Sequence, residues 1–169
     1  MPPADKIDAA QISSLVDARF DEEVAFLARL VQTPSDNPAG DCAHHAHVTA
    51  DALEALGFTV SRHPVPEAVV KAAGMISATN IVARRSFGSG GPVIALNAHG
   101  DVVPPGEGWT TDPYGAEIRD GWMYGRGAAV SKSDFATYAF AILALEKAGL
   151  ALNGTLELHG TWDEEAGGE

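Results

Sequence analysis

A histidine and an aspartate stand two positions apart, as His99 and Asp101, at the end of the apolar run 93–98. Small and apolar side chains dominate this run, which predicts a buried β-strand. Residues i and i+2 of an extended chain face the same side, so we expect the imidazole and the carboxylate to lie together where a sheet opens into a loop. A carboxylate that holds one histidine nitrogen leaves the other nitrogen free to bind a metal ion. The pair alone fits a turn capped by Asp101 better than a metal site, so a second signal is needed.

That second signal follows the alternating segment 155–162, which is typical of a half-buried strand. Three consecutive carboxylates come next, at Asp163, Glu164 and Glu165. Adjacent negative charges repel one another unless water or a cation surrounds them, so the segment is either a solvated acidic turn or part of a cation site. The glycine pair 167–168 gives the backbone behind it unusual conformational freedom. Together the two strand ends supply imidazole and carboxylate ligands that zinc accepts.

Four separate motifs, in this order and spacing, resemble the M20 family of metallohydrolases. They are His-Gly-Asp-Val-Val-Pro at 99–104, Gly-Trp at 108–109 with Asp-Pro-Tyr at 112–114, Tyr-Gly-Arg-Gly-Ala-Ala at 124–129, and Asp-Glu-Glu at 163–165. The resemblance extends from about Ile12 to the last residue. It implies the N-terminal part of a zinc hydrolase catalytic domain that cleaves the amide bond of an N-acyl amino acid or a peptide-like substrate.

The same resemblance implies a role for each residue at the two strand ends. His99 would bind one of two Zn²⁺ ions, and Asp101 would orient that histidine within the catalytic site. Glu165 would bind the other ion, and Glu164 would be the general base. These roles are chemically coherent, because a zinc ion can lower the pKa of bound water to about 7. A neighbouring carboxylate can then accept the proton and pass it to the leaving amine.

The chain departs from the family pattern at two points. Valine occupies position 130, where the family motif Gly-Arg-Gly-Ala-x-Asp has an aspartate that bridges the two metal ions. Valine cannot bind a metal, and Asp134 in the predicted helix that follows is a candidate replacement. The chain also stops at Glu169, whereas the resemblance implies a further acidic ligand, a late histidine ligand and a second domain. A non-catalytic remnant or binding module of the same fold is therefore the alternative hypothesis, and a homodimer is expected only with the missing domain.

The composition is that of an ordinary globular protein, with 46% hydrophobic residues in a chain of 169, enough for one domain with a core. A formal net charge of −12 argues against a nucleic acid or an anionic membrane as a partner, because both require a basic surface. The single cysteine, Cys42, excludes an internal disulfide and fits a reducing compartment. Residues 1–6 lack the features of a signal peptide, and no apolar run reaches membrane length, so a cytoplasmic location is expected.

Hydrophobic periodicity predicts an α/β layered domain, a mixed sheet with flanking helices that is incomplete at the C-terminus. Residues 1–169 are expected to form one unit, the N-terminal portion of a catalytic domain. Helices are predicted at 9–32, 42–56 and 133–149, strands at 58–62, 80–84, 93–98 and from 155, and a hairpin with an Asp-Gly turn at 117–124.

Two further patterns carry weaker signals. His44, His45 and His47 could suggest another metal site, but a solvated polar face on the helix at 42–56 is the favoured interpretation, because few carboxylates lie near them in the sequence. The Gly-Arg-Gly segment 125–127 could suggest a phosphate-binding loop, yet it lacks the spacing of either glycine-rich nucleotide motif.

Overall fold

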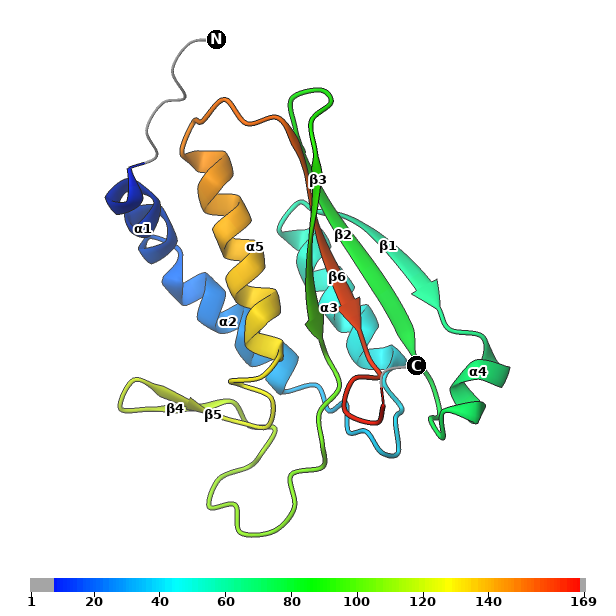
Figure 1. Ribbon diagram of the computed structural model, residues 1–169. Helices are drawn as coiled ribbons and strands as arrows, with labels where there is room; N and C mark the ends of the chain where they lie inside the picture. The colour runs from blue at the N-terminus through cyan, green and yellow to red at the C-terminus, as the bar shows by residue number, and fades with distance from the viewer. Residues whose placement is uncertain (1–7, 168–169) are drawn as a thin grey trace.

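A computed structural model describes residues 8–167. Its helices are α1 (Ala9–Asp17), α2 (Phe20–Val31), α3 (Ala43–Ala55), α4 (Glu67–Ala72) and α5 (Lys132–Lys147), and its strands are β1 (Thr59–Pro64), β2 (Thr79–Phe87), β3 (Val93–His99), β4 (Glu117–Arg119), β5 (Trp122–Tyr124) and β6 (Gly154–Thr161). The predicted α/β architecture is confirmed (Figure 1). The segment 1–6, Gly168 and the chain end at Glu169, which carry the expectations about a signal peptide, the glycine pair and truncation, lie outside the described residues.

Four strands form one mixed sheet in the order β1-β2-β6-β3, and β4 and β5 form a separate hairpin. β1 with β2 and β2 with β6 are antiparallel, whereas β3 and β6 are parallel, with Ala98 opposite Gly160 and His99 opposite Thr161. A parallel pair requires a long crossover connection, and here the chain passes through the hairpin and α5 between β3 and β6. Because parallel strands end at the same edge of a sheet, the loops after β3 and β6 begin side by side.

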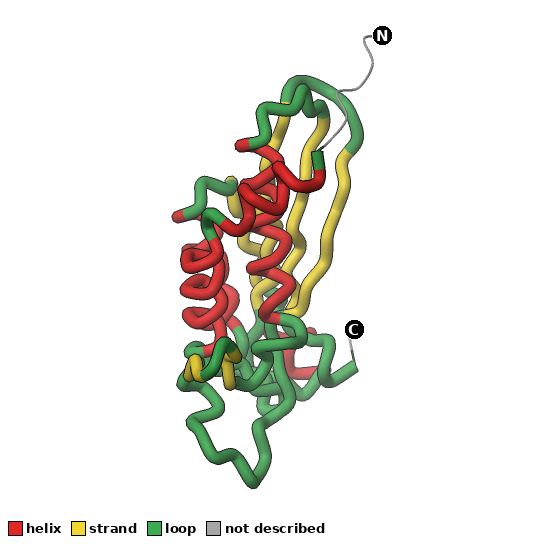
Figure 2. Tube along the Cα trace, turned by 90° about the vertical axis from the view of Figure 1, so that its left-hand side faces the viewer, coloured by secondary structure: helices red, strands yellow, loops and turns green. Residues whose placement is uncertain are grey.

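The helices α3 and α5 pack on the sheet and produce a two-layered molecule (Figure 2). α3 contacts β1 and β2, α5 contacts β3 and β6, and α2 packs on α5. The large, fully buried core side chains come from both layers: Leu30, Leu53, Ile81, Phe135, Phe140 and Leu158. Burial of such side chains contributes about 1.5–3 kcal/mol each, so this single core holds the strand ends in register.

The run 93–98 is a strand, but the expectation that it is buried is wrong. β3 lies at the edge of the sheet, and Val93 and Ile94 are 63% and 52% exposed. Only Ala98, near the end of the strand, is buried. The apolar character of the run therefore did not predict its depth, because depth depends on how many strands pair with it.

The predicted helix at 9–32 is two helices. Arg19, with φ −121° and ψ 16°, interrupts the helical backbone before α2. Its guanidinium lies over the Phe140 ring at 5.1 Å and pairs with Glu22 at 2.6 Å. α1 and α2 both contact α5, and the bend at Arg19 lets each of them do so. The six-residue α4, which begins after Pro66, was not predicted. Within the described residues, none of the helices combines the length and the hydrophobicity needed to cross a membrane.

Candidate metal centre

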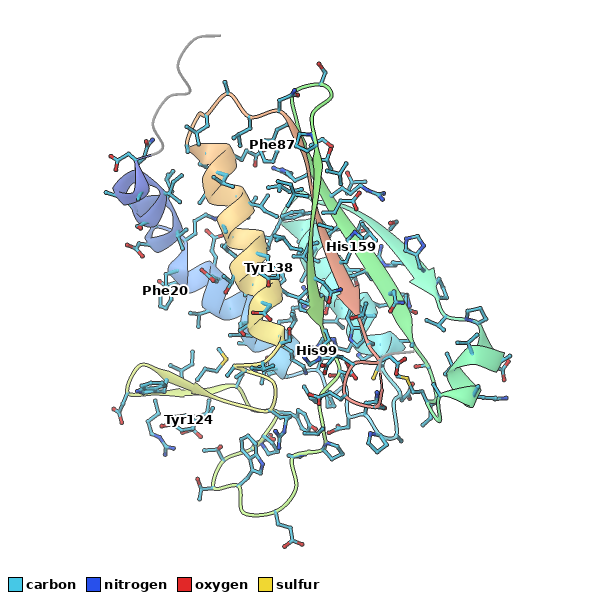
Figure 3. All side chains as sticks on the ribbon, in the orientation of Figure 1. Phe20, Phe87, His99, Tyr124, Tyr138 and His159 are labelled. Carbon is cyan, nitrogen blue, oxygen red and sulfur yellow. The ribbon has the colours of Figure 1, made fainter. Side chains whose placement is uncertain are left out.

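His99 is the last residue of β3 and lies beside the loop that follows β6 (Figure 3). Its Nδ1 lies 3.1 Å from the carbonyl oxygen of Asp101 and 3.4 Å from that residue's Oδ1. Its Nε2 lies on the side of Glu164, 3.7 Å from Oε2. The predicted geometry is therefore present: Asp101 engages one ring nitrogen and leaves the other directed at the acidic loop.

The carboxylate of Asp101 is fully buried and connects three segments of the chain. It accepts hydrogen bonds from the Asn37 side-chain amide at 3.0 Å, from the Glu165 backbone N–H at 3.0 Å and from the Glu164 backbone N–H at 3.4 Å. Asp101 therefore positions the acidic loop as well as the histidine. Sequence reasoning missed Asn37, which stands in the polar loop between α2 and α3 and had no distinguishing signal there.

The charges of this pair reinforce each other. The hydrogen bond and the negative charge of Asp101 raise the pKa of His99 above its usual value, against the opposing effect of partial burial. Burial acts to raise the pKa of Asp101, but its hydrogen bonds with His99, Asn37 and Glu165 outweigh that effect and lower it. The carboxylate therefore stays ionised, as a residue that orients a metal-binding imidazole requires.

His99, Glu164 and Glu165 bring one ligand atom each within 4.8 Å of one another. An imidazole nitrogen and two carboxylate oxygens are ligands that zinc accepts, and catalytic zinc sites typically use three protein ligands. The residues present thus fit zinc by the chemistry of their ligand atoms. The Glu164 side chain is 60% exposed, so this face is open to a small substrate. All four site residues predicted from the sequence lie together, although their individual roles stay predictions.

Position 130 lies next to this cluster through Ser131. The His99 backbone N–H donates to Ser131 Oγ at 3.4 Å, and Ser131 Oγ donates to Asp134 Oδ2 at 2.7 Å. Val130 is 66% exposed and brings an apolar side chain to this position. Within residues 8–167, Asp134 is outside the group of ligands formed by His99 and the two glutamates, so its predicted compensation for Val130 has no support in this geometry.

The histidines of α3 differ from the favoured interpretation. His44 and His47 are exposed, as a polar face predicts, but His45 is fully buried. Its Nε2 lies 3.2 Å from the Leu30 carbonyl oxygen, and its Nδ1 accepts a 2.9 Å hydrogen bond from Trp162 Nε1. Burial and the nearby Lys132 keep the pKa of His45 well below its usual value. The prediction of a solvated face is wrong for His45, because His44 and His47 lie on the exposed face of α3 whereas His45 lies on the face that packs in the core.

Residues 95–169 match the model of peptidase family M20/M25/M40, a segment that contains the end of β3 and the acidic loop. This match supports assignment of the chain to the M20 family. The motifs that predicted the resemblance are the same residues that the fold brings to one edge of the sheet.

Curated relatives extend the similarity to most of the chain. It is 39% identical over 141 residues to a succinyl-diaminopimelate desuccinylase of Gluconacetobacter diazotrophicus, covering 82% of this chain and 34% of that protein. It is 43% identical over 140 residues to the enzyme of the same name from Acidiphilium cryptum, covering 82% and 33%. The chain therefore spans about a third of the length of these relatives.

Among solved structures, human carnosine dipeptidase 1 superposes with a TM-score of 0.72 at 28% identity, covering 94% of this chain and 35% of that chain. The M20 metallo-carboxypeptidase of Sulfolobus solfataricus has a TM-score of 0.69 at 24% identity, covering 86% and 31%, and supports the fold alone. The arrangement of helices and strands is thus that of M20 proteins.

Proposed function

We propose that the chain is the N-terminal portion of the catalytic domain of a zinc-dependent amidohydrolase. The observation that carries the proposal is the convergence of His99, Glu164 and Glu165 on one point at the ends of two parallel strands. The family relationship supports hydrolysis of an amide bond in a small substrate, and the relatives named desuccinylase and dipeptidase suggest an N-acyl amino acid or a dipeptide. A second domain, a homodimer that depends on it and a cytoplasmic location stay expectations.

In this proposal His99 holds one metal ion and Glu165 holds the other; bound metal would act as a Lewis acid and lower the pKa of water. Asp101 fixes the tautomer of His99 by engaging Nδ1, so that Nε2 is the free ligand atom. Glu164 accepts the proton from the attacking water and delivers it to the leaving nitrogen. Its exposed side chain, 3.7 Å from His99 Nε2, can reach a substrate bound at the cluster.

Two substitutions in the full-length parent separate these roles. Glu164→Gln is expected to abolish turnover of N-succinyl or N-acetyl amino acids while sparing the zinc content, because the amide can no longer accept a proton. His99→Ala is expected to lower both turnover and zinc content. An unchanged rate in Glu164→Gln would refute the general-base role, and a metal-loaded parent without amidase or peptidase activity would refute the proposed function.

Val130 favours a second candidate, a non-catalytic module that keeps the fold. It replaces the bridging aspartate that the family resemblance implies, beside a serine that contacts His99. The gene sequence downstream of codon 169 distinguishes the two candidates. An in-frame continuation with another acidic ligand and a late histidine supports the enzyme, whereas a stop codon supports the module.

A further inference from the structure

Two backbone segments, here called arms, carry the residues of the metal centre: 99–101 and the acidic loop 163–165. The indole of Trp162 packs against the first arm at Gly100. It directly precedes the acidic loop 163–165, and it is fully buried. A Cβ atom placed on Gly100 would lie 2.4 Å from Trp162 Nε1, so the indole occupies the space that a side chain between His99 and Asp101 would fill. The position of this ring therefore limits how closely the backbone at Gly100 can approach it.

One polar contact fixes the orientation of this ring. Trp162 Nε1–H donates to His45 Nδ1 at 2.9 Å, across 117 residues of sequence. The ring also stacks on Phe135, with centroids 5.9 Å apart and planes 25° apart. Stacking permits the indole to slide or flip within its plane, whereas a hydrogen bond at its single donor selects one orientation.

Lys132 helps to keep His45 in the state that accepts this bond. Its buried Nζ donates to the Leu30 carbonyl at 3.1 Å and to the Thr33 carbonyl at 3.0 Å. His45 Nε2 lies 3.2 Å from the same Leu30 oxygen. Protonating His45 would bury a second cation beside the lysine, so the imidazole stays neutral, with its hydrogen on Nε2 and its Nδ1 lone pair toward Trp162.

We propose that His45 is a positioning residue of the metal centre: through its hydrogen bond to the Trp162 indole, it holds the 99–101 arm and the acidic loop at the separation that zinc requires. This inference rests on the proposed metal site. His45 touches no reacting atom, and its effect passes through Trp162 to the backbone of Gly100 and of the loop. Gly100 leaves space that the Trp162 indole fills, and the hydrogen bond to His45 fixes the orientation of that indole.

Two variants of similar shape isolate the contact. His45→Asn retains an acceptor near the position of Nδ1, whereas His45→Leu retains the bulk and lacks the acceptor. Changing His47, an exposed histidine on the same helix, to asparagine and to leucine provides the matched control. Thermal unfolding of each protein shows whether it is folded.

Three measurements report the state of the hydrogen bond, of the acidic loop and of the metal ligands. The Trp162 indole N–H resonance, assigned with Trp109→Phe and Trp122→Phe, reports the hydrogen bond itself. Hydrogen exchange of the Glu165 backbone N–H, which donates to Asp101, reports the register of the acidic loop. Titration with Zn²⁺ or Co²⁺ reports whether the ligands are in place.

In His45→Leu we expect the indole resonance to shift, Glu165 exchange to accelerate about 10-fold, and metal affinity to fall about 10-fold, as when the support of a ligand is lost. His45→Asn should restore all three, and both His47 variants should match the wild type. Wild-type exchange and metal affinity in a folded His45→Leu protein would overturn the inference. If the full-length parent binds no metal while Glu165 exchange in the chain responds as expected, the proposed function fails and the positioning role stands.

Discussion

Replacing Asp101 by asparagine should destabilise the metal-free chain by about 3 kcal/mol. Asparagine has the same shape, but one of the two carboxylate oxygens becomes an NH₂ group, which cannot accept a hydrogen bond. The neighbours of the carboxylate are donors: the Asn37 amide at 3.0 Å, the Glu165 N–H at 3.0 Å and the Glu164 N–H at 3.4 Å. In the better orientation the oxygen keeps the two shorter bonds, and the NH₂ group points at the Glu164 N–H and at His99.

The magnitude follows from these contacts. Hydrogen bonds to a charged acceptor contribute about 1.5–3 kcal/mol each and neutral ones about 0.5–1.5, so each retained bond loses about 1 kcal/mol. The unsatisfied donor adds about 1–3 kcal/mol. The carboxylate's own burial cost disappears at the same time, which lowers the total to about 3 kcal/mol.

Urea unfolding at pH 7 with a chelator present measures this difference, and thermal unfolding should show a melting temperature lower by about 6–12 °C. Asp112→Asn is the control, because the exposed Asp112 carboxylate accepts a single bond, from the Tyr114 N–H at 2.9 Å. It should change stability by less than about 1 kcal/mol. An equally small effect in Asp101→Asn would refute the view that this carboxylate holds the acidic loop.

Two further predictions concern charge and metal binding. Burial lowers the pKa of Lys132 to about 8, so on raising the pH this lysine loses its proton in the folded state before it does in the unfolded state. The free energy of unfolding should therefore rise by about 1 kcal/mol between pH 8 and 9. Lys132→Met should remove this rise. The measurement stops at pH 9 because burial raises the pKa of Cys42 to about 12, which lowers stability at higher pH. If the stability of Lys132→Met rose equally between pH 8 and 9, the rise could not be assigned to Lys132. For the metal, we expect isothermal titration to show weak zinc binding by the 169-residue chain and no turnover, and Val130→Asp to raise the affinity where the neutral Val130→Asn does not. Tight binding of two zinc ions by the unaltered chain would contradict this prediction.

The sequence alone determined the elements whose patterns are local. The Asp-Gly turn at 120–121 and its flanking residues predicted the β4–β5 hairpin, and the stop at Gly57 predicted the end of α3. The motifs around His99 and Glu164 predicted which residues would meet at the sheet edge, and the structure places them together. These predictions succeeded because turn chemistry and ligand type are properties of a few adjacent residues.

Tertiary structure alone decided how deeply each residue lies and which distant groups it contacts. The apolar β3 is exposed because only β6 pairs with it within the described residues, and His45 is buried because its helix face turns toward Trp162. Asp101 engages the backbone of Glu164 and Glu165 because β3 and β6 are parallel and end at one edge. Burial and long-range hydrogen bonds depend on the packing of segments many residues apart, and no local pattern in the chain encodes that packing.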